Sequence, residues 1–406
     1  MMRRSLFSII LFSLSFCCLV GSILYGQAVD PELEALLKEE GFDLDLDGDL
    51  LTEGDLEELL GKELLDELFE ESEWELDLKL RAGLGYGDNV LFGAFEEVDS
   101  GYLLGAFDGL YYRTVDDLWS AYVYFFGEHM EYFENVDSGK LYVTQGQVSR
   151  LSESQERNYG LSAPHLFYDQ VFDASLDQVN FDTFGVSAHQ VEIEPFVEFY
   201  FEDGDQLRVE SLWGGSRYED SYDDSDSLGG LVRYQRPIGE RSILSLEYLF
   251  EDRQYLEKDA RDAEGYAAEG VTRLKVGMGT ISLRVNAENG WRFDTKLNHY
   301  TQRDEEAGYS DYDRIRFKHT VSRAWGQWDL KLSGRYSWYD YLVRPAEFGG
   351  DALLYRRVVE GSVNLSRTLN EDLALFLESQ VERNRSNSLD NQFSAGRVMM
   401  GVEWSL

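Results

Sequence analysis

Cysteine is nearly absent from this chain. Its two cysteines, Cys17 and Cys18, both lie in the first 28 residues, together with two early arginines, a mostly apolar run and the small-residue sequence Gly26-Gln27-Ala28. This order is typical of a secretory signal peptide cleaved after residue 28, and an uncleaved anchor is the alternative. The mature chain then holds no cysteine, which excludes disulfides, thiol chemistry and cysteine-ligated metals.

Long apolar runs and basic residues are also scarce. After the leader, no apolar run approaches the roughly 20 residues of a membrane helix. If the mature chain spans a membrane, it must do so as a closed barrel, because a bilayer offers no water to unpaired backbone groups. Lys and Arg number 37 against 77 Asp and Glu, for a net charge of -40. Such a surface repels phosphate, so nucleic acid is excluded as a partner.

Residues 29–74 are predicted to form a short acidic helical hairpin. Residues 29–75 hold 20 acids and two lysines, and the leader holds two arginines, which leaves -24 for the rest. Two leucine stripes at helical spacing flank a loop that resembles an EF-hand, although Gly54 stands where that motif needs its last carboxylate. A weak calcium site and a plain solvated hairpin are the two interpretations. The candidate ligands are Asp43, Asp45, Asp47 and Asp49.

From Glu75 onward the sequence alternates between apolar and polar residues. Every second residue from Trp328 to Trp338 is apolar or glycine, and the residues between them are polar or charged. A period of two places these sets on opposite faces of a strand. Aromatic residues near both ends of the apolar face are typical of a strand that crosses a lipid layer. About sixteen such segments predict an all-β antiparallel transmembrane barrel over residues 75–406.

The connections between these segments are sorted by length. They are alternately short, as at 203–205, and longer and acidic, as at 88–100, 218–227, 251–269 and 340–352. Outer-membrane barrels have short periplasmic turns and long external loops. Alternation is poor over Lys140–Gln170, and Pro195 predicts a bulge or a local break because proline donates no backbone hydrogen bond.

The end of the chain carries a further pattern. Val402, Trp404 and Leu406 alternate with polar residues and glycine. This resembles the C-terminal insertion signal of porin-like outer-membrane barrels, which usually ends in Phe or Trp rather than Leu. The resemblance covers residues 75–406 and implies a Gram-negative-type outer membrane, its lipid and lipopolysaccharide, and the barrel-insertion machinery as partners. Homotrimers are common among porins of this size, but no segment identifies a subunit interface.

Charges on the polar faces are unevenly distributed. Two predicted strands carry acids, and four later strands carry bases, in the register that we assign to the lumen. Facing walls of opposite sign would create a field across a pore, and paired, solvated charges are the alternative. The net charge of the barrel region favours cations. The acidic set is Glu192, Glu194, Glu198, Glu202 and Glu210, and the basic set is Arg273, Lys275, Arg292, Lys296, Arg316, Lys318, Lys331 and Arg335.

Evidence for catalysis is weak. No G-x-S-x-G motif is present, and the spacing of His165 and His189 to nearby serines such as Ser162 and Ser187 specifies no catalytic pair. We therefore predict no enzyme and no cofactor beyond the calcium considered above. The predicted function is a passive channel for ions or small polar solutes. An export barrel with a periplasmic partner, and a non-conducting structural or adhesion barrel, are the alternatives.

Overall fold

The computed structural model describes residues 75–94, 97–114, 118–133, 138–173, 183–263, 265–306, 308–347 and 350–406. The predicted leader, the helical segment and the calcium ligands Asp43, Asp45, Asp47 and Asp49 lie outside these residues. In the described part of the chain, no helix is long and apolar enough to cross a membrane.

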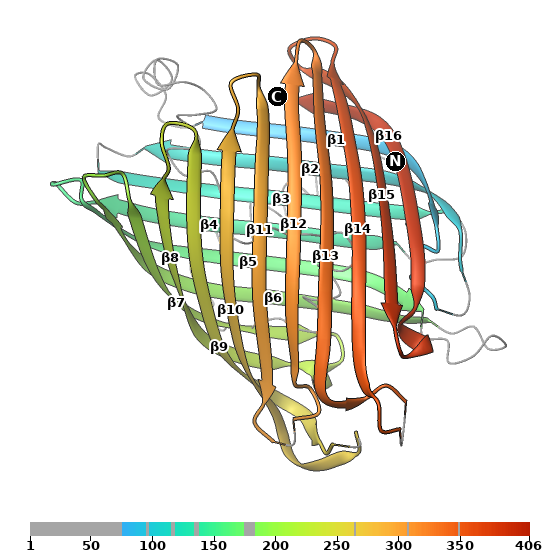
Figure 1. The fold of residues 1–406 in the computed structure, drawn as a ribbon. Coiled ribbons are helices and arrows are strands. Elements are labelled where there is room, and N and C mark those ends of the chain that lie inside the picture. The colour runs from blue at the N-terminus through green and yellow to red at the C-terminus, as the bar shows by residue number, and fades with distance from the viewer. Residues whose placement is uncertain are drawn as a thin grey trace.

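Sixteen antiparallel strands among these residues form one closed barrel, which confirms the predicted fold and strand number. Each strand pairs with its neighbours in sequence, and β1 closes the barrel against β16, with Leu84 opposite Met400 (Figure 1). The strands are β1 Glu75–Asp88, β2 Ser100–Thr114, β3 Trp119–Tyr132, β4 Gly139–Leu151, β5 Arg157–Asp173, β6 Thr183–Tyr200, β7 Gln206–Tyr218, β8 Ser225–Pro237, β9 Ser242–Arg261, β10 Ala267–Asn286, β11 Trp291–Asp304, β12 Tyr312–Trp325, β13 Trp328–Pro345, β14 Leu353–Thr368, β15 Leu373–Ser386 and β16 Phe393–Ser405.

The connections are sorted between the two ends as predicted. The short turns, such as 238–241 and 326–327, lie at the end where β1 starts and β16 stops, which we call the turn end. The opposite, loop end carries the longer connections and two short 3-10 turns, η1 Ser221–Asp223 and η2 Leu389–Asn391. The predicted acidic loop at 251–269 is mostly strand, because β9 and β10 continue as a long hairpin past the rim (Figure 1).

Two weak stretches of the sequence form regular strands. The poorly alternating segment at 140–170 contains β4 and most of β5, which pair continuously from Lys140–Asp169 to Leu151–Asn158. Of the bulge or local break predicted at Pro195, the structure shows a local break, since β6 keeps one register with both neighbours on either side of it. Pro195 pairs with Leu161 on β5, and only the pairing with β7 is interrupted at residues 194 and 195. Proline therefore interrupts pairing on one side without shifting the strand.

Candidate functional site

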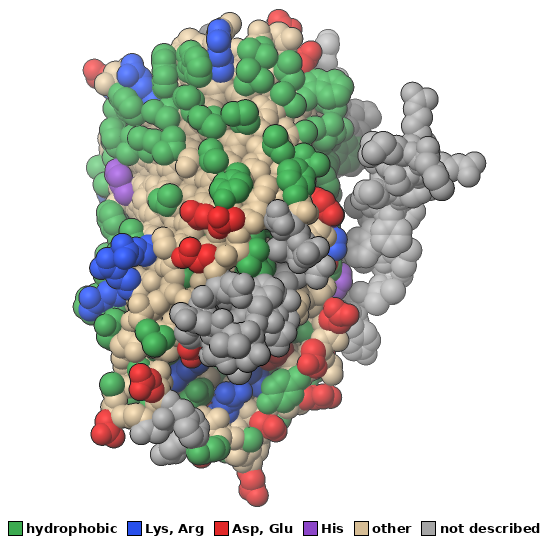
Figure 2. Space-filling view, turned by 90° about the vertical axis from the view of Figure 1, so that its right-hand side faces the viewer, with side chains coloured by type: hydrophobic (Ala, Val, Ile, Leu, Met, Phe, Trp, Pro, Cys, Tyr) green, Lys and Arg blue, Asp and Glu red, His purple; other side chains and the backbone are tan. Residues whose placement is uncertain are grey.

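The outer face of the barrel is an apolar band edged by aromatic residues. Figure 2 shows hydrophobic side chains gathered over the upper part of one face, with charged side chains beyond them. On β13 the outward residues run from Trp328 to Trp338, and Leu332 between them is 38 % exposed. The strand advances about 3.3 Å per residue and is tilted by about 40° from the barrel axis, so the ten residue steps from Trp328 to Trp338 span a height of about 25 Å along that axis. That height equals the apolar band of barrels that cross an outer membrane.

Arginines lie over tryptophans along the turn end of the same face. The guanidinium of Arg150 lies 5.5 Å from the Trp119 ring, that of Arg323 lies 5.0 Å from Trp291, and that of Arg367 lies 5.2 Å from Trp328. These tryptophans begin β3, β11 and β13. An aromatic ring beside a guanidinium group is suited to the boundary between an apolar phase and water.

The inner face of the turn-end half is polar and charged. Its residues are identified by electrostatic effects that cross the interior: the charges of Glu194 on β6 and Arg208 on β7 act on Tyr122 on β3. These strands are not neighbours in the wall. Glu128 on β3 likewise interacts with Glu378 on β15. The side chains that share the register of these residues therefore face the lumen.

Four of the five predicted acids lie on this inner face. We call them the acidic arc: Glu192, Glu194 and Glu198 on β6, and Glu210 on β7. Tyr200 donates its hydroxyl to Glu198 at 2.7 Å, and an ion pair joins Arg208 to Glu210. Glu202 is the exception. It lies exposed in the turn between β6 and β7, because β6 ends two residues earlier.

Six of the eight predicted bases lie on the inner face of β11, β12 and β13. Lys296, Lys318 and Arg335 are direct cross-strand partners in one row across the three strands, and the row continues to Glu360 on β14. Arg314 on β12 and Arg356 on β14 also lie on this face and were not among the predicted bases, although period-two spacing from Arg316 predicts Arg314. The basic arc comprises Arg292, Lys296, Arg314, Arg316, Lys318, Lys331, Arg335 and Arg356.

The remaining two bases face outward, which corrects the prediction. Arg273 and Lys275 are 44 % and 57 % exposed, and both pair with Glu305. They alternate with Leu274 and Val276, which are buried on the inner face. The prediction was wrong because it placed apolar residues outside. Toward the loop end, the inner wall at β10 is part of an apolar and tyrosine-rich cluster, in which Val276 packs with tyrosines of β11, β12 and β13.

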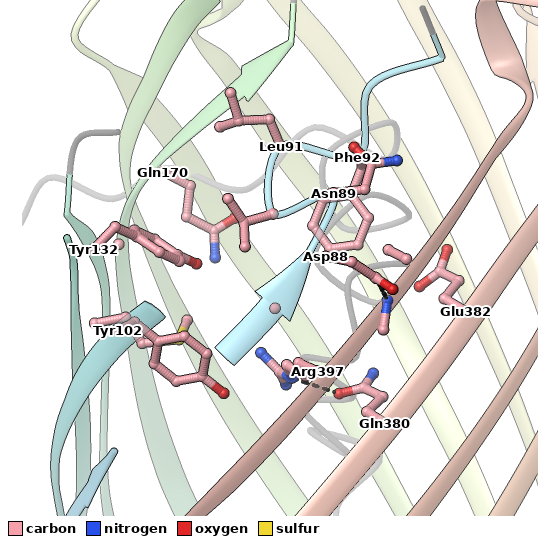
Figure 3. A pocket seen from close by; sticks show the side chains of 16 residues that line it. Asp88, Asn89, Leu91, Phe92, Tyr102, Tyr132, Gln170, Gln380, Glu382 and Arg397 are labelled. Carbon is pink, nitrogen blue, oxygen red and sulfur yellow. Dashed lines mark hydrogen bonds between the residues drawn. The ribbon is translucent and has the colours of Figure 1, made fainter. Parts of the chain in front are cut away.

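A short loop after β1 folds over the interior. In this inward loop, residues 89–94, Asn89 and Leu91 are 0 % and 2 % exposed, and the loop lines a cavity together with residues of β2, β3 and β5 (Figure 3). The side chain of Asn89 donates to the carbonyls of Gly93 at 3.0 Å and Ser394 at 3.1 Å, and accepts from the Gly93 amide at 2.8 Å. Asn89 and Phe92 have φ of 48° and 56°. The loop is therefore held in a conformation that most residues avoid.

Charged and amide side chains lie beneath the inward loop. Arg397 on β16 donates to Gln380 at 2.9 Å, and both line a cavity of about 60 Å³ together with Glu382 (Figure 3). Further toward the turn end, Arg81 pairs with Glu378 at 2.9 Å. The inward loop thus narrows the interior beside a wall of mixed charge, where a passing solute would meet it.

The two histidines and Ser162 lie on opposite faces of the barrel wall. His165 and His189 lie on the outer face, with their ring nitrogens 3.2 Å apart. Ser162 points to the opposite side of β5 and accepts a hydrogen bond from Gln145 at 2.9 Å. In the described residues, no group of three or more His, Asp or Glu side chains is arranged to hold a metal ion.

The terminal pattern lies on the outer face. Val402, Trp404 and Leu406 are 42 %, 48 % and 57 % exposed. They follow one another on the side of β16 that carries Met400. That this stripe is read by insertion machinery stays a prediction.

No protein-family model and no curated protein matches the sequence. Solved barrels are similar in fold. An anion-selective porin from Comamonas acidovorans shares 10 % identity over 83 % of this chain and 100 % of its own, with a TM-score of 0.44. A BenF-like porin from Pseudomonas fluorescens shares 13 % over 82 % and 99 %, with a TM-score of 0.45. A bacterial polysaccharide outer membrane secretin shares 10 % over 83 % and 99 %, with a TM-score of 0.43. Similarity this low says nothing of the solute, which has to be inferred from this chain's own residues.

Proposed function

We propose that the barrel spans a Gram-negative-type outer membrane and lets ions or small polar solutes pass. The proposal rests on one observation, which is that the outer and inner faces of the barrel differ in polarity. The outer face is an apolar band about 25 Å high with aromatic edges, which suits lipid. The inner face carries the acidic and basic arcs and suits water. A closed barrel of this strand number leaves room for an aqueous lumen.

The orientation follows from the connections. Short turns and both barrel termini lie at one end. In outer-membrane barrels that end faces the periplasm, so the loop end faces outward. Solute entering from outside would first meet the tyrosine-rich cluster, with Arg314 and Arg356 over its rings, and the inward loop, and then the remaining residues of the two arcs.

Selectivity would be set where the two arcs share the lumen. The basic arc spans β11–β14 and the acidic arc spans β6–β7, with three strands between them on one side and seven on the other. Rings and walls of charge set the permeability of pores. The arcs would therefore orient a dipolar solute and sort ions by sign, while the net charge of the barrel region favours cations.

The test is single-channel conductance of the refolded mature chain in a planar bilayer, with the reversal potential measured under a salt gradient. Steady openings with a cation-selective reversal potential would support the proposal. A folded barrel that remains silent would contradict an open channel. A chain beginning at Glu75 should then be compared: conductance gained by removing residues 29–74 would identify these residues as a plug, and continued silence would favour export or a structural role.

A further inference from the structure

Three arginines form a patch on the outer face near the loop end. Arg357 lies on β14, and Arg383 and Arg385 lie on β15. Arg357 is the direct cross-strand partner of Arg385, and Arg383 is the next residue on the same face. Direct partners in a sheet have Cβ atoms about 5 Å apart, and successive residues on one face lie about 7 Å apart. All three side chains are exposed. We call this patch the arginine triad.

The triad differs from the other cations at this end of the outer wall. Arg217 pairs with Asp226 at 2.9 Å, Arg273 with Asp252 at 2.5 Å, and Arg303 with Asp313 at 2.5 Å. Within the described residues, none of the triad arginines has an ion pair. The chain holds 77 acids, so this gap is a local arrangement and does not reflect a shortage of carboxylates.

The surroundings place the triad at the edge of the apolar band. The guanidinium of Arg357 lies 4.9 Å from the ring of Trp338 and 5.2 Å from that of Tyr355. On the turn-end side of the triad, Val359 and Val381 are 51 % and 58 % exposed. An apolar surface therefore adjoins a cationic one, with an aromatic ring at the boundary, as at a lipid–headgroup interface.

Asp340 is the outward-facing acid of β13 closest in register to the triad. Its partner on β14 is Tyr355, and its carboxylate accepts the indole N–H of Trp338 at 2.8 Å. It pairs with none of the three arginines. Like charges directly opposite one another on a sheet destabilise it. Among the described residues, no ion pair therefore offsets the repulsion between Arg357 and Arg385, and an external anion would relieve it.

We propose that the arginine triad binds the phosphate groups of a phosphorylated lipid in the outer leaflet. Guanidinium groups match phosphate oxygens in pairs of hydrogen bonds, and three of them fit a diphosphorylated headgroup. The lipid's chains would then lie along Val359 and Val381. The proposal rests on the barrel spanning the membrane with its loop end outward, but not on its conducting solute.

The experiment uses the full mature chain, folded in zwitterionic detergent micelles and titrated with diphosphorylated lipid A. Native mass spectrometry counts bound lipid and gives Kd. The test variant combines Arg357→Gln, Arg383→Gln and Arg385→Gln. The matched control combines Arg217→Gln, Arg273→Gln and Arg303→Gln, which removes the same charge from the same end of the outer face. Circular dichroism and heat-dependent electrophoretic mobility verify that both are folded.

Each basic residue near a lipid surface contributes about fivefold in affinity. We therefore expect Kd to rise at least tenfold in the triad variant and less than twofold in the control. If the triple variant does not fold, Arg385→Gln alone should raise Kd about fivefold. Equal binding of the dephosphorylated lipid, displacement by millimolar inorganic phosphate, or equal losses in both variants would overturn the proposal. Equal binding of the dephosphorylated lipid would mean that the lipid is held by apolar contacts only. Displacement by inorganic phosphate would mean that the triad is a general anion site. Equal losses in both variants would mean that any basic residues on this face attract the lipid.

Discussion

Arg335 on β13 donates its Nε–H to Glu360 on β14 at 2.6 Å, and both side chains are almost enclosed, at 4 % and 10 % exposed. The two residues are direct cross-strand partners on the inner face. This ion pair ends the row of bases that starts at Lys296.

Removing one member of this pair should destabilise the barrel. Glu360→Leu leaves an enclosed guanidinium without its carboxylate, which costs about 3 kcal/mol. The double variant Arg335→Met/Glu360→Leu should return close to the parent, because no enclosed charge is then left without its partner. Denaturant unfolding in lipid vesicles, followed by tryptophan fluorescence, measures both. Equal losses in the single and double variants would contradict the argument.

Reversing charge in the basic arc should change ion selectivity. In Lys296→Glu/Lys318→Glu, two adjacent inner-face bases become acids, and we expect the reversal potential to shift toward cations. The control is Arg273→Glu/Lys275→Glu, which makes the same change in charge on the outer face. Its reversal potential should equal that of the parent. An unchanged reversal potential in the inner-face variant would mean that the basic arc does not determine ion selectivity.

The conformation of the inward loop should depend on Asn89. Asn89→Ala removes three side-chain hydrogen bonds and puts alanine at φ 48°, where a Cβ is unfavourable. We expect a mobile loop and noisier, larger single-channel currents. In Asn89→Gly the glycine adopts this backbone angle without strain but makes no side-chain hydrogen bonds. Comparing the two variants therefore separates the effect of backbone strain from that of the lost hydrogen bonds. Currents that match the parent in both variants would mean that the loop does not restrict the pore.

A charged side chain should destabilise the barrel more on the outer apolar band than on the inner face. Leu332 faces outward midway between Trp328 and Trp338, and its neighbour Ser333 faces inward. Leu332→Arg should cost about 2–4 kcal/mol of unfolding free energy in vesicles, as for a cation facing the middle of a bilayer. Ser333→Arg should cost much less, because water solvates it. Similar costs at the two positions would mean that the band is not lipid-facing.

Much of the fold could be predicted from period-two patterning. The alternation through β13 predicted which residues share a face, and the turn lengths predicted which connections share an end. These features are local, since they depend only on strand geometry. The same logic placed ten of the thirteen predicted acids and bases correctly on the inner face, with Glu202, Arg273 and Lys275 as the exceptions. That the acidic and basic arcs line a conducting pore stays a prediction.

The exceptions have physical causes that act over long distances in sequence. The apolar residues of β10 face inward because tyrosines of β11, β12 and β13 form an inner cluster with them. The inward loop depends on a hydrogen bond from Asn89 to Ser394, more than 300 residues away. Such contacts follow closure of β1 against β16 and leave no local periodic signal.

The sequence by itself determined that the chain after Glu75 alternates, that its turns are sorted by length and that its two faces differ in polarity. Only the tertiary structure decided which face of each strand points inward, where the inward loop lies and which arginines of the described strands form no ion pair. The reason is that a period of two defines two faces but not their direction, and only barrel closure brings distant strands together to assign it.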